Sequence, residues 1–152
     1  MNLKWQYAMV ASVVLAAACG SNQQSSQTSS SSGGSSSPRV YFVEPKDGDT
    51  VKSPVHLKFG IDNYELAAVP AGTVETARPN VGHHHVGVDQ DCLAPGTTIV
   101  KGTPSWVHFG DGKSEIDMQL PPGRHKLSLQ LGDDLHRAVD SLCQTITVNV
   151  VE

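Results

Sequence analysis

The sequence predicts an all-β domain, an immunoglobulin-like antiparallel β-sandwich of about seven to eight strands, preceded by a signal peptide and a disordered serine-rich linker. Apolar and polar residues alternate in short segments from Pro38 onward, which is typical of strands with one buried face. Clusters of proline and glycine separate these segments, and no stretch of useful length has the helical period. Several short strands with turn signals between them favour two packed antiparallel sheets.

The beginning of the chain is predicted to be a targeting signal. Lys4 supplies a positive charge, residues 8–18 form a short, mostly apolar run, and small residues precede Cys19. This run is too short for a transmembrane helix, which needs about 20 apolar residues. The pattern resembles a bacterial lipoprotein signal, so we expect residues 1–18 to be removed and lipid, including palmitate, to be attached to Cys19. An ordinary secretory signal that is cut at the alanine-rich stretch is the alternative.

Residues 19–37 are expected to be the lipidated cysteine followed by a flexible tether. Residues 20–37 contain only Gly, Ser, Asn, Gln and Thr, and none of these side chains could join a core. As a coil, these residues have a root-mean-square end-to-end length of roughly 23 Å. The β domain at residues 38–152 would therefore be connected to the membrane through this tether and the lipid anchor at Cys19. No aspartate follows Cys19 directly, which favours the outer membrane of a bacterial cell envelope over the inner membrane.

Within residues 38–152, alternation of apolar and polar residues locates the strands in order. The expected strands, with 65–68 as a short edge strand, are 40–43, 55–61, 65–68, 82–89, 105–109, 114–120, 124–131 and 145–150. The expected turns lie at 44–49, 70–72, 110–112 and 121–123. In the strand at 105–109, Val107 and Phe109 are expected to face the core, and Trp106 and His108 to face outward.

The cysteines predict one disulfide bond. Lipidation would consume Cys19, and Cys92 and Cys143 then remain as an even pair in an oxidising compartment. A bridge between them would close a loop of about fifty residues, which the chain-entropy estimate values at roughly 4 kcal/mol. Ligation of a metal ion by one of these thiolates is the alternative, although the pair lacks Cys-x-x-Cys spacing.

Three consecutive histidines mark the strand at 82–89. Because successive strand side chains point to opposite faces, His83 and His85 share one face and His84 lies on the other. The Cα atoms of His83 and His85 should be roughly 6.7 Å apart, and two imidazoles at that separation can converge on one ion. A third histidine from a neighbouring strand would complete a metal geometry, whereas one interior and two surface histidines is the plainer interpretation.

The preferred metal ligands are His83, His85 and His108, with His136 as a fourth, and Zn²⁺ or Cu²⁺ as the ion that suits neutral imidazoles. This choice requires that the strands carrying them are neighbours. His84 and His125 share faces with apolar residues and are expected to be structural. His56 falls on a polar face and is expected at the surface.

Five motifs follow one another in order along this domain. They are Phe42-x-x-Pro45-x-Asp47-Gly48, Pro70-Ala71-Gly72-Thr73, Gly82-His83-His84-His85, His108-Phe109-Gly110-x-Gly112, and Leu120-Pro121-Pro122-Gly123-x-His125-x-Leu127-x-Leu129 with Gly132-Asp133 and His136. The set resembles the bacterial domain-of-unknown-function family numbered 4399, which consists of small exported or lipid-anchored proteins. The resemblance extends from about Val40 to Val150 and implies a fold and a location, but no activity.

Three classes of function remain open. The first is a cell-envelope lipoprotein that binds copper or zinc for storage, resistance or delivery. The second is an immunoglobulin-like interaction or scaffolding module that contacts another envelope protein or a glycan without a metal. The third, a zinc-dependent hydrolase with Glu115 or Asp111 as general base, is disfavoured because the common hydrolase motifs are missing. A nucleic-acid partner is excluded, since the net charge is −4 and the 11 basic residues are scattered.

Overall fold

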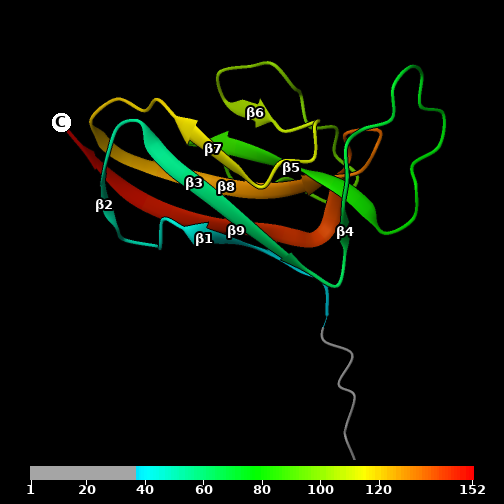
Figure 1. Ribbon diagram of the computed structural model, residues 1–152, viewed down its shortest axis with the longest axis horizontal. Coiled ribbons are helices and arrows are strands. Elements are labelled where there is room, and N and C mark those ends of the chain that lie inside the picture. The colour runs from blue at the N-terminus through cyan, green and yellow to red at the C-terminus, as the bar shows by residue number, and fades with distance from the viewer. Residues whose placement is uncertain (1–36) are drawn as a thin grey trace, which may run out of the picture. The chain divides into compact units, whose positions relative to one another are not determined.

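The computed structural model describes residues 37–152, so the predictions for the signal at 1–18, for Cys19 and for the tether up to residue 36 lie outside the described part of the chain. The described residues form an all-β sandwich, as the alternation predicted, with nine strands (Figure 1). The strands are β1 (Arg39–Glu44), β2 (Thr50–Lys52), β3 (Val55–Asp62), β4 (Glu65–Leu66), β5 (Val81–Val88), β6 (Trp106–His108), β7 (Glu115–Met118), β8 (Gly123–Gly132) and β9 (Ala138–Val151). In the same part of the chain there is no helix with the length and apolar character needed to span a membrane.

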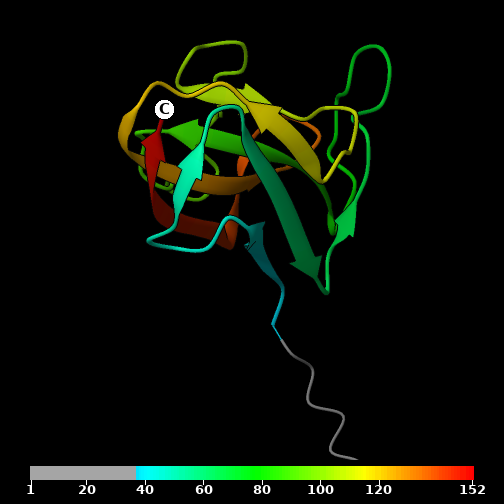
Figure 2. The same cartoon turned by 60° about the vertical axis from the view of Figure 1, so that its left-hand side comes forward.

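The strands form two sheets that pack face to face. The small sheet has the order β1-β3-β7, and the large sheet has the order β2-β9-β8-β5-β4, with β6 also paired to β5. Figures 1 and 2 show β1 and β3 lying across the long, curved strands β8 and β9. Two short pairings, β2 with β9 and β4 with β5, are parallel and depart from the antiparallel prediction. Alternation of side chains defines the faces of a strand and not the direction of its partner.

The main core lies between the two sheets. Leu57 and Phe59 of β3 face Leu127, Leu129 and other apolar side chains of the large sheet, and these four are at most 4% exposed. Full burial of such side chains contributes roughly 1.5–3 kcal/mol each. The inward-facing residues are those that the period-two pattern predicted, because a strand whose one face is buried has a strongly specified register.

A second, smaller core covers the outer face of the large sheet. Ile99, Trp106 and Ala138 are buried together there, with Leu93 packed against them. The connection between β5 and β6 supplies Leu93 and Ile99. Its backbone is bound to the β8–β9 turn, where Ile99 N–H donates to His136 O over 2.7 Å. Trp106 was expected to face outward, and it does lie outside the main core, but this connection covers it and leaves it 7% exposed.

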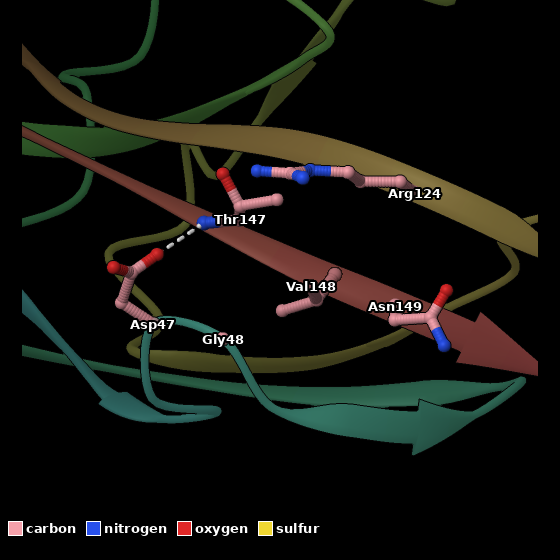
Figure 3. A pocket seen from close by; sticks show the side chains of 6 residues that line it. All are labelled: Asp47, Gly48, Arg124, Thr147, Val148 and Asn149. Carbon is pink, nitrogen blue, oxygen red and sulfur yellow. Dashed lines mark hydrogen bonds between the residues drawn. The ribbon is translucent and has the colours of Figure 1, made fainter.

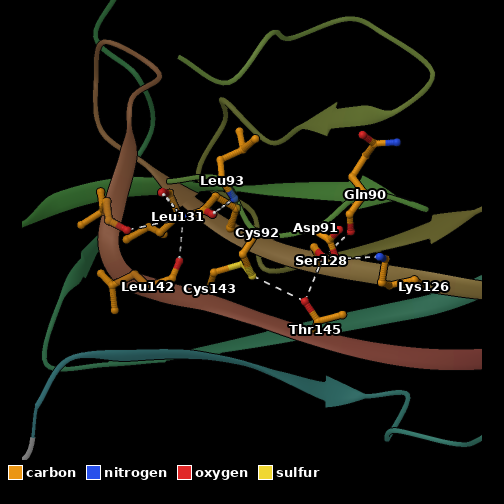
Figure 4. Close-up of a disulfide and its surroundings, with 12 residues drawn as sticks. Gln90, Asp91, Cys92, Leu93, Lys126, Ser128, Leu131, Leu142, Cys143 and Thr145 are labelled. Carbon is orange, nitrogen blue, oxygen red and sulfur yellow. Dashed lines mark hydrogen bonds and ion pairs between the residues drawn. A yellow bond between two sulfur atoms is a disulfide. The ribbon is translucent and has the colours of Figure 1, made fainter. Parts of the chain in front are cut away.

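The disulfide joins this connection to the large sheet. Cys92 and Cys143 are bonded, and their positions differ by 51 in the sequence (Figure 4). Next to the bridge, the buried side chain of Gln130 accepts a hydrogen bond from Leu93 N–H at 3.2 Å and donates one to Leu142 O at 3.1 Å. The bridge and Gln130 therefore hold the start of the connection against β8 and β9.

Replacing both Cys92 and Cys143 with alanine should lower the free energy of unfolding by about 4 kcal/mol, because the unfolded chain regains the freedom of a loop of this length. Urea unfolding of the oxidised and double-variant proteins measures the difference. Equal unfolding midpoints for the two proteins would contradict the prediction.

Candidate metal centre

Four histidines from three segments meet on the outer face of the large sheet. They are His83 and His85 of β5, His108 at the end of β6, and His136 in the β8–β9 turn, and together they are called the histidine cluster. These are the four candidate ligands that the sequence predicts, and the structure brings all four together. Whether they bind a metal stays a prediction.

Strand pairing brings the members of the cluster together. His85 lies opposite His108 in the antiparallel pair of β5 and β6, so their side chains share a face. On the other edge of β5, His83 lies opposite Gly132, the last residue of β8. The turn that follows carries His136 back over β5 in a left-handed backbone conformation, with φ at 60°. Such a conformation is uncommon for residues other than glycine and is found often at functional sites.

The ring nitrogens of the histidine cluster are close enough to share one ion. One nitrogen from each ring lies within 4.8 Å of the corresponding nitrogens of the other three. The Nε2 atoms of His108 and His136 are only 3.0 Å apart. A central zinc ion has Zn–N distances near 2.0–2.1 Å, so each ligand nitrogen would need to move toward the ion by about 1 Å or less.

Burial divides the cluster into an inner and an outer pair. His83 and His85 are 0% exposed, and neither ring nitrogen of either residue has a hydrogen-bond partner. Leaving a buried polar group without a partner costs about 1–3 kcal/mol. His108 and His136 are partly exposed and form the solvent side of the cluster. A cation held between the rings would bind one nitrogen of each inner histidine and offset part of this cost.

The inner imidazoles are held in the neutral form that binds metals. Burial, with a smaller contribution from the neighbouring histidines, lowers the pKa of His83 to about 3 and that of His85 to about 2. Burial also lowers the pKa values of His108 and His136. Metal ligation requires the deprotonated nitrogen, so little proton release opposes binding at neutral pH.

Two glycines make room for the rings. A Cβ atom on Gly132 would lie 2.6 Å from Cε1 of His85, and one on Gly110 would overlap the ring of His108. Sequence reasoning missed both as parts of the site. A glycine that ends a strand often marks a close approach, and this was the signal that could have identified Gly132.

Two ion pairs lie beside the histidine cluster. Asp134 is 3% exposed, and its carboxylate accepts hydrogen bonds from Arg78 Nε and Nη2, each at 2.8 Å. The Arg78 side chain is the main reason that the pKa of Asp134 falls to about 2. Asp133 forms a similar ion pair with Arg137. Two carboxylates thus lie beside the cluster, and each already has an arginine partner.

The remaining histidines lie outside the cluster. His84 points to the inner face of the large sheet, where its ring packs 5.2 Å from that of Phe59 and its Nδ1 is 3.3 Å from Lys113 O. His125 is held by Asp89 and by the carbonyl of Pro121. Both positions agree with the structural roles expected from the sequence.

His56 is exposed, as expected, and its Nδ1 atom lies 2.8 Å from a carboxylate oxygen of Asp117 on the small sheet. Its separation from the histidine cluster makes it a suitable control position.

A separate concavity lies near the other end of β8. It has a volume of about 400 Å³, and Figure 3 shows the residues that line it, namely Asp47, Gly48, Arg124, Thr147, Val148 and Asn149. One Asp47 oxygen accepts the backbone N–H of Thr147 at 2.7 Å. Arg124 lies at the start of β8, whereas the histidine cluster adjoins Gly132 at its end. The concavity and the cluster are therefore distinct features.

The fold and the cluster define the class of the molecule as a β-sandwich protein with a histidine-rich candidate metal centre. The family model described as "Domain of unknown function (DUF4399)" matches residues 57–151, and the chain belongs to this family. The match includes every member of the histidine cluster and confirms the resemblance seen in the sequence.

Similarity to other known proteins is weak or absent. A solved structure of the endo-beta-1,4-mannanase from Thermotoga petrophila is similar, with a TM-score of 0.45 and 17% sequence identity. The similarity covers 77% of this chain and 20% of the mannanase chain, so this chain spans about a fifth of that protein. No curated protein matches the chain at a significant level.

Replacing Gly132 with alanine should weaken metal binding by about 10-fold or more, because the new methyl group displaces the His85 ring from the cluster. Titration with Zn²⁺ measures the effect. Gly87→Ala is the matched control, because Gly87 lies on the same strand as His85 and the atoms nearest to its added methyl group belong to Trp106, at 2.9 Å, and to Gln90. Equal metal affinity in both variants would contradict the proposed position of His85.

Proposed function

We propose that this protein is a cell-envelope lipoprotein that binds one Zn²⁺ or Cu²⁺ ion through the histidine cluster, and that it holds or delivers the ion at the membrane surface. The convergence of four imidazoles, two of them fully buried with unpartnered nitrogens, is the observation that carries the proposal. Neutral imidazole is a preferred ligand of both ions. A core that only needed to be filled would not require four adjacent polar rings.

The number of ligands favours binding over hydrolysis. Zinc sites that catalyse reactions have three protein ligands and an open position, whereas four protein ligands are typical of closed sites. In this protein the four histidines would occupy all the positions of a tetrahedral ion. Of the two bases considered from the sequence, Asp111 forms an ion pair with Lys113, and Glu115 lies on β7 in the small sheet.

The membrane location rests on the sequence before the β domain. The lipoprotein-type signal, Cys19 and the tether at 20–37 support an anchor with a flexible connection. The absence of aspartate after Cys19 supports the outer membrane. The histidine cluster would then be held close to the membrane and remain free to meet a partner in the envelope.

A second candidate function is the interaction module without a metal. The concavity that contains Arg124 supports it, because its lining offers a guanidinium group and the side chains of Asp47 and Asn149 to a polar protein segment or glycan. This candidate places the binding site at the other end of β8 and assigns no role to the cluster. Loss of partner binding on substitution of Arg124 would support it.

The purified full-length protein should bind one equivalent of Zn²⁺ or Cu²⁺. His83→Ala and His85→Ala should each weaken binding by at least about 100-fold, since loss of a direct ligand exceeds the 10–100-fold effect of losing an outer partner. Calorimetric titration measures this, and His56→Ala, which removes an exposed histidine, should bind as the wild type does. Unchanged affinity in both cluster variants would exclude the metal site.

Cys19→Ala should abolish lipidation and release the protein from the membrane. Incorporation of labelled palmitate and fractionation of the cell envelope measure both effects. A variant that stays in the membrane fraction would contradict anchoring through Cys19 and favour another mode of attachment.

A further inference from the structure

We infer that the histidine cluster is a tetrahedral centre built for Zn²⁺, and that it imposes an unfavourable geometry on Cu²⁺. This inference rests on the proposed function and adds the identity of the ion. The inference depends on how the four rings are arranged around their common centre, because the two ions prefer different arrangements of their ligands. Zinc takes four ligands tetrahedrally, whereas Cu²⁺ with nitrogen ligands prefers a square-planar or tetragonal arrangement.

The two geometries predict different distances between the rings. With a metal–nitrogen distance of about 2.1 Å and a ring radius of about 1.1 Å, each ring centre lies about 3.2 Å from the ion. A tetrahedron then places all six pairs of ring centres about 5.2 Å apart. A square plane places four pairs at about 4.5 Å and the two opposite pairs at about 6.4 Å.

The observed ring distances match the tetrahedron. The six distances between ring centres run from 4.6 Å for His83 and His85 to 5.7 Å for His85 and His136. If the latter were one diagonal of a square, His83 and His108 would form the other diagonal. Those two rings are only 4.9 Å apart. No choice of opposite pairs gives two long distances, because the other four also lie between 4.6 and 5.1 Å.

The scaffold opposes a change to a flat arrangement. β5 pairs with β8 along one edge and with β4 and β6 along the other, so its backbone is fixed at His83 and His85. Both inner rings are fully buried, and the backbone of Gly132 packs against the ring of His85. Flattening would therefore require the outer rings, on His108 and His136, to make most of the movement.

The type of ligand disfavours Cu⁺, the other common tetrahedral ion. Cu⁺ is selected by soft thiolate and thioether groups, and the cluster contains only imidazole nitrogen. The two cysteines of the described region form the disulfide. Four neutral nitrogen ligands in tetrahedral positions are the set that zinc accepts.

Binding of Co²⁺, Zn²⁺ and Cu²⁺ to the full-length protein tests the inference. Co²⁺ reports geometry, because a four-coordinate tetrahedral site gives intense visible absorption and a six-coordinate site gives weak absorption. We expect the intense spectrum, and we expect one equivalent of Zn²⁺ to remove it. A weak Co²⁺ spectrum, or an electron paramagnetic resonance spectrum of bound Cu²⁺ that is typical of a square plane, would overturn the inference. If none of the three ions bound, the proposed function itself would fail.

A variant at His136 should affect the affinities for Zn²⁺ and Cu²⁺ differently. His136→Asn removes one imidazole and keeps a residue type that adopts the left-handed backbone conformation of this position. Zn²⁺ affinity should fall by at least about 100-fold, since a tetrahedral ligand is lost. Cu²⁺ affinity should fall by about 10-fold or less, because the remaining three imidazoles and water can adopt the arrangement that Cu²⁺ prefers. Equal losses for the two ions would contradict a tetrahedral constraint, and His56→Ala should change neither affinity.

Discussion

The candidate centre depends on the pairing of β5 along both of its edges. β8 pairs with one edge of β5, and β4 and β6 pair with different parts of the other edge. This pairing fixes the register that places His83 beside the end of β8 and His85 opposite His108. A shift of one residue would turn both inner histidines into the core and bring His84 to the outer face. The pairing of β5 therefore accounts for both the convergence of the histidine cluster and the inward position of His84.

The connection between β5 and β6 converts an open sheet face into a buried site. Its backbone is bonded to the β8–β9 turn, and the disulfide at Cys92 ties its start to β9. Ile99 and Trp106 then fill the space beside the histidine cluster with apolar groups. This packing leaves His83 and His85 fully buried, and no protein group forms a hydrogen bond with their ring nitrogens. The small outer core and the unsatisfied imidazoles are two results of the same packing.

The sequence predicted the faces of the strands well and their neighbours poorly. Alternation placed His83 and His85 on one face of β5 because the side-chain period of a strand is two. It could not establish that β6 lies next to β5, so the inclusion of His108 depended on an assumed pairing that the structure supplies. The burial of Trp106 was missed for a related reason, since the connection that covers it has no regular period. The contact of Gly132 with the His85 ring depends on a close approach between segments almost fifty residues apart, which a local pattern does not contain.

The charge balance around the cluster bears on what a bound ion would do. Four neutral imidazoles leave the full charge of a divalent cation in place, and buried charge is costly unless it is compensated. Asp133 and Asp134 lie on one side, but Arg137 and Arg78 already pair with them. Burial and the charge of Lys101 both lower the pKa values of His108 and His136, so Lys101 opposes a cation. Compensation must therefore come partly from solvent at the outer pair of histidines, which favours an ion that can leave through that side over one that is locked in place.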